Sequence, residues 1–160
     1  MSSEEPNLTK IRNHALRLLS KRSYSQLQLE LKLLRHYPEK EVMTLLEELI
    51  ERRLLDDASL AEERALMLRS RRHWGTQRIK GDLRRLGFNA KMVARATDRA
   101  ESAFPSEETL ARVIQVWTRK NGEPGSVARL KKLFDHCRRQ GFPSQMVRDL
   151  LEPFWGRLDR

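Results

Sequence analysis

Basic side chains are the most abundant charged groups in this sequence, and the chemistry they offer is the binding of anions. The chain carries 32 lysines and arginines against 22 aspartates and glutamates, a formal net charge of +10. This excess suits nucleic acid, an acidic protein surface or an anionic membrane without choosing among them. The candidate binding residues form two clusters: Arg69, Arg71, Arg72, Arg78, Lys80, Arg84 and Arg85, then Arg129, Lys131, Lys132, Arg138 and Arg139.

Arginine dominates the first cluster, and its planar guanidinium forms paired hydrogen bonds with a carboxylate or a phosphate. Residues 57–105 hold 11 basic against 6 acidic residues, and residues 106–160 hold 11 against 7. Residues 1–56 are almost balanced, with 10 against 9. We therefore expect the second and third parts of the chain to carry the binding surface.

The sequence lacks the residue sets of common enzymes. It contains no G-x-x-x-x-G-K-[ST] loop and no G-x-G-x-x-G loop, and its seven glycines are scattered singly. The four histidines are isolated, and a single cysteine cannot form the usual sulfur-rich zinc site. We expect a protein that is not an enzyme and that needs no metal or cofactor.

The single cysteine also bears on the compartment, because no intrachain disulfide can form and a reducing environment is expected. The first ten residues are polar and unlike a secretory signal. No apolar stretch approaches the roughly 20 residues needed to span a bilayer. We expect a cytoplasmic monomer that does not contact a membrane.

An internal repeat indicates how the basic side chains are positioned. A shift of 50 residues superimposes apolar on apolar positions and places Tyr24 on Trp74. A further shift of 54 places Gly87 on Gly141, with the extra residues in the turn-rich segment 121–125. Units of this size bury little surface alone and are stabilised by stacking on their neighbours.

Apolar residues recur at helical spacing in each unit, which predicts three helices per unit and an all-α chain. Ser25 and Asn89 are predicted N-caps, Pro38 is predicted to open a helix, and Gly87 to close one. We predict three tandem three-helix repeats that form an elongated, curved array. The predicted divisions are a disordered tail at 1–7, repeats at 8–55, 56–105 and 106–155, and a C-terminal tail at 156–160.

Two features could suggest catalysis, and the repeat gives each a simpler interpretation. Asp56 and Asp57 stand where they can cap the first helix of the second unit. Cys137 lies beside His136, which could make it a nucleophile, but the repeat places it at a core position equivalent to Leu83. We expect capping aspartates and a buried, unreactive thiol.

The basic clusters have their own simple interpretation as solvated surface. Two observations favour binding: the clusters recur on equivalent helices of two repeats, and they have few acidic neighbours. Trp74, beside the first cluster, could anchor an interface. We favour instead a core aromatic equivalent to Tyr24.

Short motifs follow one another in a specific order in the second repeat: Leu55-Asp56-Asp57, Arg69-Ser70-Arg71, Trp74-Gly75, Arg78-Ile79, Leu83 and Gly87. This order resembles the RecX family, the bacterial regulators of the RecA recombinase. The resemblance covers about residues 10–155. Thr76 replaces the customary proline and Asp82 the usual glutamate.

The resemblance implies a helical array that binds the RecA filament on single-stranded DNA, with direct DNA contact left open. Such a protein limits filament extension, strand exchange and ATP hydrolysis. It also damps the co-protease activity that drives the SOS response in DNA repair and recombination. The two basic clusters would then be the partner-binding residues.

Two other functions stay open at this point. The chain could be a stand-alone nucleic-acid-binding protein in which the helix between Gly75 and Gly87 serves as a recognition helix. Gln77 and Arg84, seven residues apart, give this thin support. It could also be a scaffold for an acidic protein unrelated to recombination.

Overall fold

The chain folds into helices joined by short turns. The computed structural model describes the backbone of residues 4–159 and the side chains of residues 7–159. Within this part there are nine helices and no strand, which confirms the predicted all-α fold. The helices are α1 (Glu4–Lys21), α2 (Gln26–Leu34), α3 (Glu39–Glu51), α4 (Asp57–Arg72), α5 (Thr76–Arg85), α6 (Ala90–Ala103), α7 (Ser106–Asn121), α8 (Val127–Arg139) and α9 (Ser144–Leu158).

Three separate hydrophobic cores hold the helices in consecutive groups of three. Leu33, Leu83 and Cys137 stand at equivalent positions of the internal repeat, and each is fully buried in a different core. Each helix packs mainly against the other two helices of its group. The buried residues of the three cores lie within the predicted repeats 8–55, 56–105 and 106–155.

Local signals set the helix ends as the sequence predicts. The Ser25 hydroxyl accepts from the backbone N–H of Gln28, whose side chain accepts in return from the N–H of Ser25. Asn89 caps α6, and Asp56 caps α4 through the N–H of Ser59. Gly87 follows the end of α5 with a φ of 89°, in the left-handed region that favours glycine.

The first helix begins earlier than predicted. α1 starts at Glu4, so the prediction of a disordered tail at 1–7 is wrong for residues 4–7, and residues 1–3 lie outside the described part. Pro6 does not prevent this start, because the N–H groups of a first helical turn have no partner within the helix.

The last helix ends later than predicted. α9 runs through Pro153 to Leu158, so the tail predicted at 156–160 is wrong as far as Leu158. Proline inside a helix removes a hydrogen bond and weakens it. Here Phe154 and Trp155 pack against the third core, and this contact stabilises the final turns.

The first and second groups meet where α2 begins against the end of α5. The Ser25 hydroxyl, besides capping its own helix, donates to the backbone oxygen of Leu86 at 2.6 Å. The N–H of Gln26 donates to the carboxylate of Asp57 at 2.9 Å. A Cβ on Gly87 would lie 2.5 Å from a methyl group of Leu27, so the close approach requires glycine.

The second and third groups meet in the same way, with α5 beginning against the end of α8. The N–H of Gly75 donates to the backbone oxygen of Gln140 at 2.7 Å, and the N–H of Gln77 donates to that of Gly141 at 3.2 Å. A Cβ on Gly75 would lie 2.4 Å from the carbonyl carbon of Gly141. The two backbones therefore touch directly.

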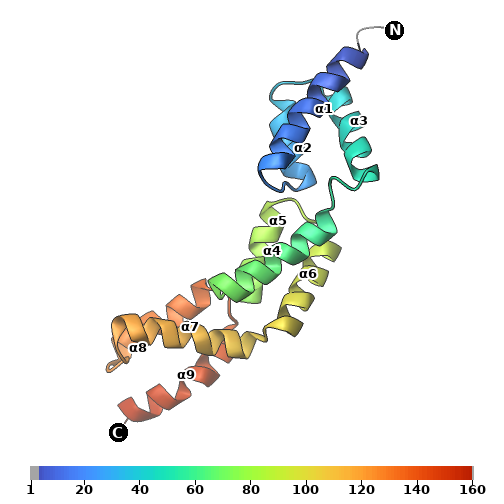
Figure 1. Cartoon of the computed structure of the whole chain (residues 1–160). Coiled ribbons are helices and arrows are strands. Elements are labelled where there is room, and N and C mark those ends of the chain that lie inside the picture. Colours follow the sequence, from blue (N-terminus) through green and yellow to red (C-terminus); the bar gives the residue numbers. More distant parts are fainter. Residues whose placement is uncertain (1–3, 160) are drawn as a thin grey trace.

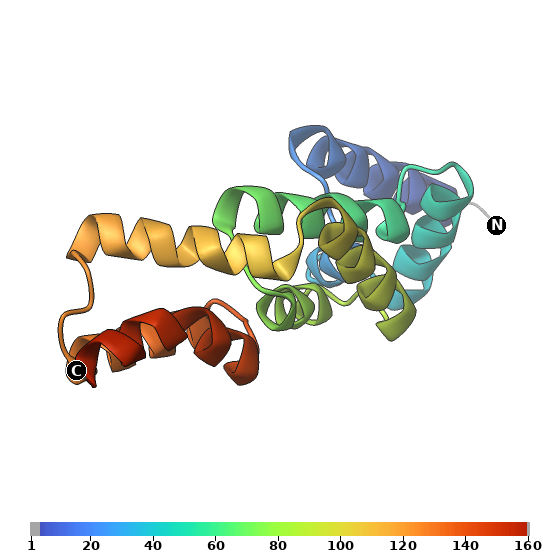
Figure 2. The same cartoon turned by 90° about the horizontal axis from the view of Figure 1, so that it is seen from below.

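These junctions line up three helices in what we call the central column: α8, α5 and α2, each ending where the next begins. Their dipoles run head to tail, so the partly negative end of one helix meets the partly positive end of the next. The three groups consequently follow one another in an elongated array from the N-terminus to the C-terminus (Figure 1). The view at right angles shows the third group extending away from the other two (Figure 2).

Candidate partner-binding surface

Four basic side chains of the second group are exposed or half-buried, and we refer to them together as the second-repeat ridge: Arg71, Arg72, Lys80 and Arg84. Arg71 and Arg72 end α4, whereas Lys80 and Arg84 lie one turn apart on α5. Arg71, Arg72 and Arg84 are exposed and Lys80 is half-buried. Within residues 7–159 none of the four side chains has an ion-pair or hydrogen-bond partner. These charges are free to meet an anionic partner.

Arg69, predicted as a binding residue, is a structural residue instead. Its side chain is 0% exposed. The guanidinium donates to the carboxylate of Glu101 at 3.1 Å, to the backbone oxygen of Phe104 at 3.0 Å, and to the hydroxyls of Ser106 and Thr76 at 3.0 and 2.7 Å. Residue 69 falls on the inner side of α4, so a partner cannot reach it, and the prediction for Arg69 is wrong.

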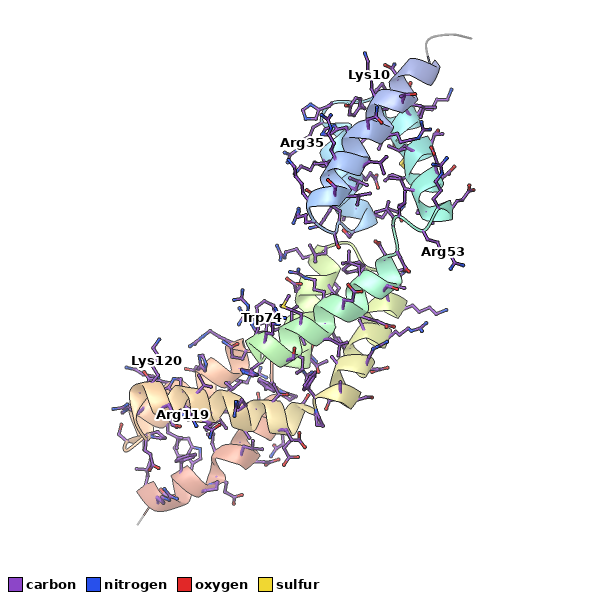
Figure 3. The ribbon with its side chains drawn as sticks, in the orientation of Figure 1. Lys10, Arg35, Arg53, Trp74, Arg119 and Lys120 are labelled. Carbon is purple, nitrogen blue, oxygen red and sulfur yellow. The ribbon has the colours of Figure 1, made fainter. Side chains whose placement is uncertain are left out.

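Arg78 and Trp74 form a stacked pair at the junction of the second and third groups. The Arg78 guanidinium lies 3.8 Å from the centre of the indole ring, the geometry of a cation–π contact. It also donates to the side-chain oxygen of Gln140, the residue that follows α8, at 3.1 Å. Trp74 itself packs against the second core, as expected for the equivalent of Tyr24. Figure 3 shows it where the two groups meet.

Arg85 is exposed but already has a partner, the buried carboxylate of Asp82. That carboxylate accepts from Arg85 at 2.9 Å and from Arg64 of α4 at 2.5 Å. Burial alone would raise the pKa of Asp82, but the hydrogen bonds from the two guanidiniums outweigh it and leave the pKa lowered. Asp82, the residue that departs from the family pattern, therefore ties α5 to α4.

The third-group cluster divides in the same manner between structural and free residues. Arg129 donates to the backbone oxygen of Asn121, and Arg138 to that of Phe142 at 3.1 Å. Both contacts hold turns that flank α8. Three exposed side chains have no such contact within residues 7–159: Lys131, Lys132 and Arg139.

The column brings the ends of the two clusters together. Burial, followed by the positive charges of Arg139 and Arg78, lowers the pKa of His136. One arginine belongs to α8 and the other to α5, so charges from both clusters act on a single imidazole. Arg78 of the first cluster and Arg139 of the second therefore lie close to His136 at the α5–α8 junction, although the sequence separates them widely.

The other chemical candidates have structural roles. Asp56 caps α4, as expected. Cys137 is buried, and burial raises the pKa of its thiol to about 12, so the reactive thiolate does not form near neutral pH. No group of three or more metal-ligating side chains occurs among the described residues. None of the helices in that part is both long and apolar enough to span a membrane.

The exposed cations of the first group were not predicted, because that group is nearly neutral as a whole. Five glutamates lie on α3, and one of them, Glu48, pairs with Arg12 of α1. Lys10 and Arg17 lie on α1, and Arg35 directly follows α2. Figure 3 shows Lys10 and Arg35 at the N-terminal end of the array. The spacing of Lys10 and Arg17, which are two helical turns apart, could have predicted that both lie on one face of α1.

The architecture places the chain among helical repeat proteins. No family model matches the sequence, and no curated protein matches it either. Several solved structures share the fold, and two of them are RecX structures. RecX from Lactobacillus salivarius superimposes with a TM-score of 0.76 at 18% identity, over 97% of this chain and 98% of that one. A structure described as regulatory protein RecX gives 0.79 at 20% identity, over 94% of this chain and 74% of that one. The chain therefore has the RecX fold.

Proposed function

We propose that this chain is a RecX-family regulator that binds the RecA–DNA filament and inhibits it. The inhibition would cover filament extension, ATP hydrolysis, strand exchange and co-protease activity. In this proposal the protein acts in the cytoplasm as a monomer, by binding rather than by catalysis, and without a cofactor. The RecX fold and the ordered motifs of the second repeat both support it.

The observation that carries the proposal is that unpaired cations stand on two successive groups, which are joined directly through their backbones. The second-repeat ridge and the three free cations of α8 lie on successive groups joined by backbone hydrogen bonds. A filament repeats its subunits at regular intervals, so an elongated array with charge on successive groups can engage neighbouring subunits at once. Linking two contacts in this way raises the affinity well above that of either contact alone.

A direct test measures the DNA-dependent ATPase of RecA on single-stranded DNA. A substoichiometric amount of the protein should lower the steady-state rate, because one bound array would restrain several filament subunits. An unchanged rate at micromolar protein would contradict the proposal.

The alternative of a helix-turn-helix-like nucleic-acid reader is less well supported. A recognition helix contacts base edges through its N-terminal residues. The N-terminus of α5 instead meets the end of α8, with the N–H groups of Gly75 and Gln77 bonded to Gln140 and Gly141. A groove-reading approach by this end of α5 would require the two groups to separate.

A further inference from the structure

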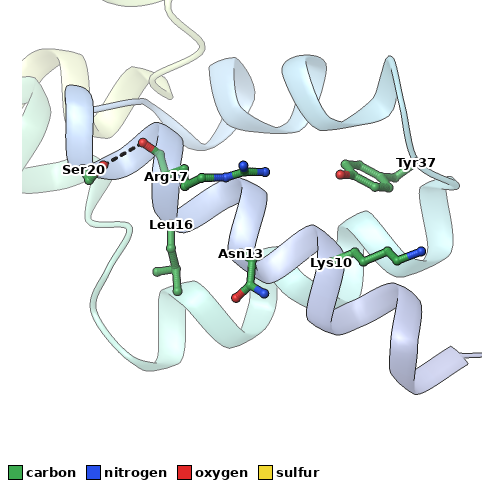
Figure 4. A pocket seen from close by; sticks show the side chains of 6 residues that line it. All are labelled: Lys10, Asn13, Leu16, Arg17, Ser20 and Tyr37. Atoms are coloured by element: carbon green, nitrogen blue, oxygen red, sulfur yellow. Dashed lines mark hydrogen bonds between the residues drawn. The ribbon is translucent and has the colours of Figure 1, made fainter.

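The first group carries a shallow groove of about 820 Å³ beside α1. It is lined by Lys10, Asn13, Leu16, Arg17, Ser20 and Tyr37. Figure 4 shows the Arg17 side chain extending towards the ring of Tyr37, with the Lys10 side chain below the ring in this view. The groove lies outside the two basic clusters and has no role in the proposed function.

The groove has one wall of regularly spaced polar side chains. Lys10, Asn13, Arg17 and Ser20 recur every three or four residues and therefore share one face of α1. Ile11 and Ala15, on the opposite face, are fully buried in the first core. Lys10 and Arg17 are seven residues apart, or about 10 Å along the helix. This separation matches about three nucleotides of a stacked strand at about 3.4 Å each.

The electrostatic environment of the groove is positive. None of the six lining residues is an acid. Within residues 7–159 no carboxylate forms an ion pair with Lys10 or Arg17. Burial and then the charges of Arg17, His36 and Lys32 lower the pKa of His14, which lies beside the groove. Several cations from α1 and α2 thus act at one place.

An aromatic cluster closes one end of the groove. The Tyr37 ring packs edge-to-face with His14 and His36, at centroid separations of 5.7 and 6.3 Å. The hydroxyl of Tyr37 lies 3.2 Å from Nδ1 of His14, which fixes the ring in place. A ring held next to cations offers a platform on which an unpaired base can stack.

We infer that this groove binds a short stretch of single-stranded nucleic acid, with Lys10 and Arg17 on the phosphates and Tyr37 against a base. An acidic peptide would satisfy the cations but would leave the ring without a stacking partner. Duplex DNA would offer phosphates, but its bases are already paired and stacked. The combination of a cation stripe, neutral donors and a fixed ring therefore favours the single strand.

The test measures fluorescence anisotropy of a labelled oligo(dT) of about 15 nucleotides, a length suited to a small binding surface, with the full-length protein. Lys10→Glu combined with Arg17→Glu should weaken binding about tenfold or more and lower the salt dependence by about 1.4 in log–log slope. Arg119→Glu combined with Lys120→Glu is the matched control. It changes the net charge equally at two exposed positions of α7, and it should weaken binding much less. Circular dichroism should show that both variants remain folded.

Two further comparisons identify the ligand. Tyr37→Leu should weaken oligo(dT) binding several-fold, whereas Tyr37→Phe, which keeps the ring and loses the hydroxyl, should retain it. The protein should prefer oligo(dT) to a duplex of equal length and to poly-glutamate. Equal losses in the groove and control variants would overturn the inference, as would equal competition by poly-glutamate or duplex, or no effect of Tyr37→Leu.

This inference goes beyond the proposed function, and the two can fail separately. The anisotropy experiment contains no RecA, so its failure leaves the filament proposal standing. An unchanged RecA ATPase rate leaves the groove intact as a nucleic-acid site.

Discussion

Two arginines near the end of α4 show how one residue type serves two purposes. Arg69 is fully buried and donates to four acceptors, which lie on α5, α6, the α6–α7 connection and the first residue of α7. Arg71, two residues later, is exposed and has no partner among the described residues. The sequence places both in one basic run, and their roles separate only when the helix is packed. Tertiary contacts decide which arginine faces inward, and the number of charges in the segment does not predict those contacts.

Replacement of Arg69 by methionine should therefore destabilise the fold. The substitution removes the Arg69 donor from the Ser106 hydroxyl, from the backbone oxygen of Phe104 and from Glu101, which keeps only its bonds from Ser106, so we expect a loss of about 3 kcal/mol in the free energy of unfolding. Urea unfolding followed by circular dichroism measures it. Arg71→Met is the matched control and should change stability by no more than about 0.5 kcal/mol. Similar values for the two variants would contradict the structural role of Arg69.

Carboxylates paired with arginines also make stability depend on pH. Burial opposes ionisation of Asp82 and Glu101, but bonds from Arg64 and Arg85 to Asp82, and from Ser106 and Arg69 to Glu101, outweigh it and lower both pKa values. The unfolded chain therefore takes up protons first as the pH falls. The stabilisation of the fold by these two ionised carboxylates is complete above about pH 5. It is lost as the pH drops through the pKa values that the carboxylates have in the folded state.

Acid should thus lower the urea midpoint, and Asp82→Asn should reduce the size of that drop. The variant should be less stable than the wild type at pH 7, where the wild-type carboxylate is ionised and paired. The difference between the two proteins should shrink towards pH 3. If the difference in urea midpoint between the wild type and Asp82→Asn stays constant from pH 7 to pH 3, ionised Asp82 does not cause the pH dependence of stability.

The helices themselves could be predicted well, because their signals are local. Apolar spacing and the caps at Ser25, Asp56 and Asn89 placed most helix ends correctly. The predicted start of α1 and the predicted end of α9 were wrong. The start of α1 depends on a proline being tolerated in the first turn, and the end of α9 depends on packing against the third core. The column of α8, α5 and α2 could not be predicted, because its junctions join residues far apart in the sequence. The internal repeat in the sequence shows that Gly87 and Gly141 are equivalent, but it does not predict which residues contact them.

The junction glycines give a prediction about the column. Gly75 has an ordinary φ of −74°, so alanine there has no backbone penalty. Its Cβ would nevertheless lie 2.4 Å from the Gly141 backbone, and we expect Gly75→Ala to cost about 2 kcal/mol. Gly81→Ala, on the same helix with no atom within 4 Å of the new Cβ, should instead stabilise by about 1 kcal/mol. Thermal unfolding compares the two, and equal shifts would contradict the direct backbone contact.

In the whole molecule, the junctions of the column fix how the three groups are placed relative to one another. They therefore also fix how far apart the charges on neighbouring groups lie. The sequence predicted both basic clusters and their repeat relationship. It could not predict that Arg69, Arg78, Arg129 and Arg138 hold the structure together while their neighbours stay free. The first-group groove was also not predicted. The net charge of a segment adds together residues that folding places on different faces, so it does not reveal a basic face. Fewer free cations therefore remain in the predicted clusters, and free cations also occur in the first group.

Co-sedimentation with preformed RecA filaments on single-stranded DNA measures whether the second-repeat ridge contacts the filament. The wild type and the Arg119→Glu/Lys120→Glu control should both sediment with the filament. Arg71→Glu combined with Arg84→Glu should reduce the affinity about tenfold or more while leaving helicity unchanged, because reversed charges repel an anionic partner. If this ridge variant binds the filament as tightly as the wild type, the second-repeat ridge is solvated surface and does not contact the filament.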